Sequence, residues 1–169
     1  MKLVPPRTIL VVDDDVLVCT ALSRLLEAQG YTVFVAESGE QGLEVLARQP
    51  AQLVISDQNM PGISGIDFLK IVRQKHPQVL RMMLTADDDP ETIVRSINEG
   101  EVYRFIRKPW QSDHLRATVH FAFEVILLEE ENRHLVSIIR RQRAELRQIR
   151  PTPDAEAELV LAEADLLGR

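Results

Sequence analysis

The stretch LVISDQNMPGISG, residues 53–65, decides how this chain folds. Its first four residues are apolar or small and predict a short buried strand. Asp57 stands where that strand ends and where a loop containing Pro61 and Gly62 begins. Ligands of open parallel α/β sheets bind at the carboxyl ends of strands, so Asp57 is a candidate for chemistry. On this stretch alone, a role as turn former or helix cap fits equally well.

Three further apolar runs also end in polar side chains. Residues 8–12 precede Asp13, Asp14 and Asp15, residues 79–84 precede Thr85, and residues 103–106 precede Arg107 and Lys108. The four predicted strand ends therefore offer carboxylates, a hydroxyl and an ammonium group.

These runs, taken in order, resemble the receiver domain of two-component response regulators. The matching pieces are ILVVDDD, SDQNMPGISG, MLTAD and the pair Lys108-Pro109, and the resemblance covers residues 7–120. The segment YRFIRKPW resembles a subset of receivers carried by cyclic-di-GMP phosphodiesterases of the HD-GYP type and by some transcriptional activators. The plainer interpretation of its Trp110 is a hydrophobic staple at the start of the last helix.

Apolar residues between the strands recur at helical spacing. They predict helices that begin near Val16, Ser38, Ile66, Asp89-Pro90 and Ser112. Residues 31–36 form a fifth apolar run and predict one more strand. Five strands that alternate with five helices favour an α/β fold with a parallel sheet covered on both faces. The resemblance implies a flavodoxin-like, doubly wound (βα)5 sheet of order 2-1-3-4-5, here with an extended C-terminal helix.

The resemblance also implies the roles of the polar residues. Asp57 is the expected phosphoacceptor for a sensor histidine kinase, Lys108 and Thr85 assist the transfer, Phe105 is the switch aromatic, and Mg²⁺ binds Asp13, Asp14, Asp57 and the backbone carbonyl of Asn59. Carboxylates brought together repel unless they share a cation, and a set of oxygen ligands suits Mg²⁺. We therefore expect a phosphorylated switch and not an enzyme.

The last helix is predicted to be unusually long, because no Pro or Gly occurs between Trp110 and Arg150. Its apolar residues are spaced alternately by four and three, as in a coiled coil of about four heptads. The a positions are Val125, Asn132, Ile139 and Leu146; the d positions are Phe121, Leu128, Leu135, Gln142 and Ile149. This pattern predicts a parallel homodimer through residues 121–149; the alternative is an amphipathic helix that packs on its own receiver.

We accordingly divide the chain into a receiver domain (1–120), a coiled-coil extension of the fifth helix (121–150) and an acidic tail (151–169) that is a weak helix or disordered. The net charge of −6 speaks against direct nucleic-acid binding. The single cysteine, Cys19, and the lack of a signal peptide or membrane-length apolar run favour a soluble protein of the cytoplasm, without a membrane partner.

Two other functions compete with the switch. A Mg²⁺-dependent aspartyl phosphatase similar to the haloacid-dehalogenase-like family needs a second Asp two residues after the nucleophile, where this chain has Asn59. A scaffold that is not phosphorylated would not need the full set of polar residues. We expect the signal to pass through the dimeric coil to an output domain or a partner protein.

Overall fold

The computed structural model describes residues 6–86, 94 and 102–148. Its five parallel strands form one sheet of order β2-β1-β3-β4-β5, as predicted. The strands are β1 (Thr8–Val12), β2 (Thr32–Ala36), β3 (Leu53–Asp57), β4 (Leu80–Thr85) and β5 (Arg104–Arg107). Several strand ends differ from the predicted ones by a single residue. For example, Asp57 still belongs to β3 because it pairs with Leu84 of β4.

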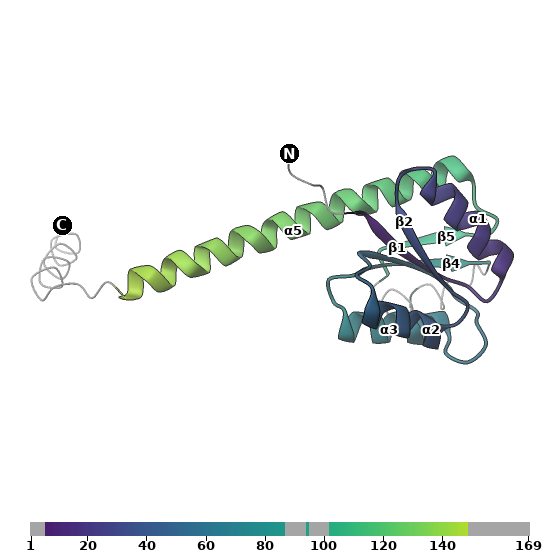
Figure 1. The fold of residues 1–169 in the computed structure, drawn as a ribbon, viewed down its shortest axis with the longest axis horizontal. Coiled ribbons are helices and arrows are strands. Elements are labelled where there is room, and N and C mark those ends of the chain that lie inside the picture. The colour runs from purple at the N-terminus through teal and green to yellow at the C-terminus, as the bar shows by residue number, and fades with distance from the viewer. Residues whose placement is uncertain (1–5, 87–93, 95–101, 149–169) are drawn as a thin grey trace, which may run out of the picture. The chain divides into compact units, whose positions relative to one another are not determined.

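Four helices are described: α1 (Val16–Glu27), α2 (Gly39–Arg48), α3 (Gly65–Lys75) and α5 (Ser112–Gln148). Side chains of Asp15, Ser38 and Ser64 cap the first three by accepting a hydrogen bond from a backbone N–H in the first turn. α1 and α5 cover one face of the sheet, whereas α2 and α3 cover the other (Figure 1). The helix predicted near Asp89-Pro90 and the tail of residues 151–169 lie outside the described residues.

Two hydrophobic cores fill the space between the sheet and these helices. Alternate residues of β1 divide between them, because side chains along a strand point to opposite faces: Ile9 and Val11 face α1 and α5, whereas Leu10 and Val12 face α2 and α3. Both faces of the central strands are thus buried, which explains their continuous apolar sequence. Trp110 is partly buried against the first core, at the entry to α5.

The long last helix is confirmed as one continuous element from Ser112 to Gln148. Its first part belongs to a compact unit that ends at Leu127, and a second unit begins at Leu128. Buried residues of the first part pack in the core shared with α1; they are Leu115, Val119, Ala122, Phe123 and Ile126. Every residue at positions 127–145 is exposed. Within the described residues, no helix has the length and apolarity needed to cross a bilayer.

Candidate functional site

The carboxylates predicted to converge do lie together at the carboxyl ends of β1 and β3. Asp13, Asp14 and Asp57 each place one carboxylate oxygen within 4.8 Å of the others. Asp13 and Asp57 are buried, whereas Asp14 is exposed. The pairing of β1 with β3 causes this meeting, because residues at equivalent strand ends come side by side.

Lys108 closes the site from the end of β5. Its Nζ lies 2.6 Å from Asp57 Oδ1 and 2.7 Å from Asp13 Oδ2, so one ammonium group bridges both buried carboxylates. The backbone holds this residue in place, since Lys108 N donates to the carbonyl of Thr85 over 2.8 Å. The peptide bond between Lys108 and Pro109 is cis.

The two buried carboxylates also accept hydrogen bonds from the backbone. Asp57 Oδ2 accepts from Asn59 N at 2.9 Å, and Asp13 Oδ1 accepts from Asp15 N at 2.9 Å. Asp57 therefore keeps a fixed orientation, with one oxygen on Lys108 and the other on the loop that follows β3. These bonds arise locally, because an Asp side chain readily reaches the N–H two residues further along.

Burial and charge act in opposite directions on these groups. Burial raises the pKa of Asp13 above its ordinary value, although the hydrogen bond from Lys108 opposes this change. For Lys108, burial alone lowers the pKa, but hydrogen bonds to Asp13 and Asp57 outweigh it and raise the pKa above its ordinary value. The ammonium group thus stays charged at neutral pH beside Asp57.

Thr85 and Phe105 lie on β4 and β5, the two strands beyond β3 on this side of the sheet. Thr85 ends β4 and is buried. Phe105 of β5 pairs with Met83 of β4 and packs against the core under α2 and α3. The Thr85 hydroxyl donates to Gln58 Oε1.

Gly65 and Gln58 also shape the site, although neither was predicted from the sequence to do so. A Cβ atom at Gly65 would lie 1.9 Å from the carbonyl oxygen of Asp57, so only glycine allows α3 to begin this close to the site. A sequence signal for Gly65 exists, since it is the last residue of the stretch LVISDQNMPGISG. No sequence pattern identified Gln58, because its partner lies 27 residues away on another strand.

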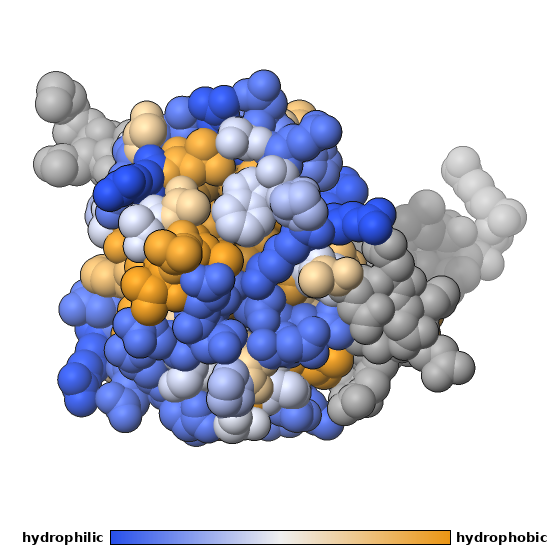
Figure 2. Space-filling view, turned by 90° about the vertical axis from the view of Figure 1, so that its right-hand side faces the viewer, coloured by the Kyte–Doolittle hydropathy of each residue, from blue (hydrophilic) through white to orange (hydrophobic). Residues whose placement is uncertain are grey.

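Apolar side chains are exposed next to the acidic residues. Val16 and Leu17, in the first turn of α1, expose 53% and 78% of their surface. Figure 2 views the molecule from the right-hand side of Figure 1, the side on which the first turn of α1 lies. On this face, hydrophobic residues gather among hydrophilic ones. An exposed apolar surface beside a reactive group is suited to contact with another protein.

Comparisons with known proteins agree with this arrangement. Residues 9–120 match the response regulator receiver domain family. The chain is 37% identical over 141 residues to the hydrogenase transcriptional regulatory protein HoxA of Cupriavidus necator, covering 83% of this chain and 29% of that protein. It is 39% identical over 114 residues to the transcriptional regulatory protein ZraR of Escherichia coli, covering 68% of this chain and 26% of that protein.

Solved structures show the same fold. The signal receiver domain of an HD domain-containing protein from Pseudomonas fluorescens superposes with a TM-score of 0.70 at 35% identity, covering 72% of this chain and 97% of that one. The chain spans less than a third of the length of the two curated relatives. Receiver domains bind Mg²⁺ at an acidic pocket, are phosphorylated by sensor histidine kinases and connect to output domains. From its fold, its acidic cluster and these matches, the chain belongs to the response regulator receiver family.

Proposed function

We propose that this chain is a phosphorylation switch in which Asp57 accepts the phosphoryl group. The observation that carries the proposal is the position of the Asp57 carboxylate, which lies 2.6 Å from Lys108 Nζ and within 4.8 Å of the oxygens of Asp13 and Asp14. A carboxylate attacks phosphorus only when nearby positive charge offsets the repulsion between anions. Lys108 supplies part of this positive charge, and a divalent cation bound by the three carboxylates would supply the rest.

In the proposed reaction, an Asp57 oxygen attacks the phosphorus of a phosphohistidine on a sensor histidine kinase. A new P–O bond forms, the P–N bond breaks, and the histidine nitrogen keeps the electron pair of the broken bond and takes up a proton. Lys108 neutralises phosphoryl oxygens during the transfer, and the Thr85 hydroxyl afterwards donates to one of them. The exposed Val16 and Leu17 offer the kinase an apolar contact beside the site.

Mg²⁺ fits the donor atoms of the cluster. We propose that Asp13, Asp14, Asp57 and the backbone carbonyl of Asn59 hold it, since hard oxygen ligands suit this ion. When bound, the ion would neutralise charge on the phosphoryl group.

We further propose that Phe105 is the switch aromatic. It has no hydroxyl group, so packing alone distinguishes its two positions. It is partly buried and lies one strand away from Thr85, on the face of the sheet where Met83 and Thr85 point. Movement of Thr85 toward the phosphoryl group would therefore reach Phe105 through direct neighbours.

In the proposed function, residues 121–149 form a homodimeric coiled coil. The signal passes through this coil from the receiver domain, residues 1–120. Apolar side chains at the predicted a and d positions support this dimer: Phe121, Leu128, Leu135 and Ile139 are 63%, 65%, 59% and 49% exposed. An exposed apolar row of this length favours burial against a second helix. The occupant we propose is a second copy, because the row has the a/d spacing of a parallel two-stranded coil.

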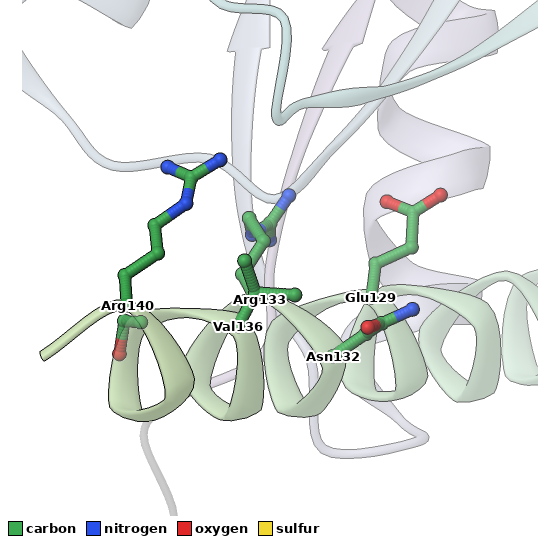
Figure 3. A pocket seen from close by; sticks show the side chains of 6 residues that line it. Glu129, Asn132, Arg133, Val136 and Arg140 are labelled. Carbon is green, nitrogen blue, oxygen red and sulfur yellow. The ribbon is translucent and has the colours of Figure 1, made fainter. Parts of the chain in front are cut away.

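Two polar residues on one flank of the seam fit the same proposal. A hollow in the surface of α5 is lined by Asn132, Glu129 and Val136 on this flank and by Arg133, Ser137 and Arg140 on the side that faces away from the seam (Figure 3). In the predicted heptads, Asn132 occupies an a position and Glu129 an e position. A single Asn at an a position fixes the register of two helices, and charges at e positions select the partner. An output domain or partner protein downstream of the coil then receives the signal.

Labelling with radioactive acetyl phosphate in the presence of Mg²⁺ tests the phosphoacceptor. We expect one label per chain, removed by alkali or hydroxylamine because an acyl phosphate is labile, and no label on Asp57→Asn. The matched control is Asp113→Asn, which replaces an exposed carboxylate at the start of α5 and should label normally. Normal labelling of Asp57→Asn, or a label that resists hydroxylamine, contradicts the assignment.

A further inference from the structure

The Thr85 hydroxyl group is held by a side chain that lies next to Asp57 in the sequence. Thr85 Oγ1 donates to Gln58 Oε1 over 2.5 Å, and both residues are buried, with 5% and 7% of their surface exposed. Gln58 reaches this position because its backbone N–H donates to the carbonyl of Leu84, which continues the pairing of β3 with β4 by one residue. The two side chains therefore lie side by side on one face of the sheet.

A threonine hydroxyl has a single hydrogen to donate. While that hydrogen lies on Gln58 Oε1, it is not available to a phosphoryl oxygen on Asp57. The Asp57 carboxylate meanwhile has its own partners, Lys108 Nζ and Asn59 N. Gln58 and a phosphoryl group on Asp57 would thus compete for the same donor.

We propose that Gln58 is a positioning residue that retains the Thr85 hydroxyl in the unphosphorylated state and so weakens binding of the phosphoryl group. This inference rests on the proposed function of Asp57 and Thr85. The transition exchanges one acceptor for another: the bond from Thr85 to Gln58 Oε1 breaks, and a bond from Thr85 to a phosphoryl oxygen forms. Buried polar atoms that lose a partner are unfavourable, so the free amide oxygen of Gln58 opposes the exchange.

The same bond also opposes movement of the switch aromatic. Met83, two residues before Thr85, is on the same face of β4 and pairs with Phe105 of β5. A hydroxyl anchored to Gln58 keeps the end of β4 in its present place beside Phe105. Gln58 therefore sets how much interaction energy from the phosphoryl group is needed before Phe105 repacks.

Titration with beryllofluoride, an analogue of the phosphoryl group, tests the inference by calorimetry in the presence of Mg²⁺. Gln58→Leu has a similar volume but no acceptor, so it should bind beryllofluoride about threefold to tenfold more tightly than the wild type. Gln74→Leu, at an exposed position on α3, is the control and should bind like the wild type. If Gln58→Leu folds poorly, Gln58→Met keeps the unbranched shape and should also bind more tightly.

A double-mutant cycle with Thr85→Val separates positioning from a general structural effect. Without the hydroxyl, replacing Gln58 with Leu should no longer change the affinity, because there is no donor left to release. An equal gain in the Thr85→Val background, or no gain in the Thr85 background, overturns the role of Gln58. Failure of the wild type to bind beryllofluoride at all overturns the proposed function as well, so the two failures are distinguishable.

Discussion

The carboxylate cluster and the exposed part of α5 differ in whether their side chains find partners within the described chain. Around Asp57, buried charges are paired within the chain: Lys108 contacts two carboxylates, and backbone N–H groups bind the remaining oxygens. Along positions 127–145 of α5, the large apolar side chains are exposed in the part of the chain that the structure describes. The first region is complete in one chain, whereas the second has a hydrophobic surface to bury.

Under the proposed function, the carboxylate cluster carries out the phosphorylation, and the exposed part of α5 passes on the signal. Every side chain that takes part in the proposed phosphoryl transfer comes from one chain, so a monomer supplied with Mg²⁺ should be phosphorylated. An exposed apolar row gains stability only by association. Under the proposed function, substitutions in one region should therefore leave the other region's activity intact.

The largest expected effect is the loss of the dimer in the double variant Leu135→Asp and Ile139→Asp. Both residues belong to the predicted seam, so a dimer would bury four carboxylates without partners. We expect the dissociation constant of the dimer to rise by more than about a thousandfold. Sedimentation equilibrium should show wild-type dimers and variant monomers at micromolar concentration, while labelling of Asp57 stays unchanged.

Two substitutions on the opposite side of the same helix provide a matched control. Ser137→Asp and Ala144→Asp add the same charge at f positions, outside the predicted seam, and should leave the dimer intact. A wild-type monomer, or a seam variant that remains dimeric, would defeat the coiled-coil proposal. Loss of labelling in the seam variant would show that the two regions are not independent.

A smaller effect is expected from Asp14→Ala, which removes the exposed member of the carboxylate cluster. Fewer carboxylate ligands bind a divalent cation less tightly, so the affinity for Mg²⁺ should fall by about tenfold. Calorimetric titration with Mg²⁺ measures the change. Equal affinity in the variant and the wild type would exclude Asp14 as a ligand.

Asp15→Ser is the matched control for this experiment. Asp15 caps α1 by accepting a hydrogen bond from Leu17 N, and serine can keep that cap while it removes one nearby negative charge. We expect a smaller loss of Mg²⁺ affinity than in Asp14→Ala. A loss of the same size would mean that overall charge, and not ligation, governs the affinity.

The remaining prediction concerns the Cys19 thiol beneath the site. Burial, together with the negative charge of Asp13, raises the pKa of Cys19 to about 11. The folded chain thus holds this proton more tightly than the unfolded chain; the stabilisation is complete below the ordinary thiol pKa and is lost as pH rises toward 11. At pH 9, iodoacetamide should alkylate the native protein at least about tenfold more slowly than the chain in urea.

Because Cys19 is the only cysteine, any thiol label reports on this position alone. Equal rates in buffer and in urea would show that the core under α1 opens readily. That result would weaken the contrast between a closed site and an open helix.

The order of the described elements, the strand ends that carry the polar residues and the length of the last helix could all be predicted from the amino-acid sequence. These features depend on local sequence. Apolar runs of four to six residues predict buried strands, and helical spacing predicts amphipathic helices. The lack of Pro and Gly after Trp110 lets α5 continue to Gln148. Helical spacing did not reveal that α5 changes from core packing to exposure near Leu127. Both parts of the helix carry apolar residues at similar intervals, and burial depends on what lies opposite.

Only the tertiary structure decided which polar groups meet. It places Lys108 between Asp13 and Asp57, brings α3 so close to Asp57 that residue 65 must be glycine, and pairs the Thr85 hydroxyl with Gln58. The physical reason is that each of these contacts joins separate elements across the sheet, and their geometry follows from strand register and helix approach. Hydrophobic periodicity records which face of an element is buried, but a hydrogen bond of under 3 Å between distant residues leaves no periodic trace in the sequence.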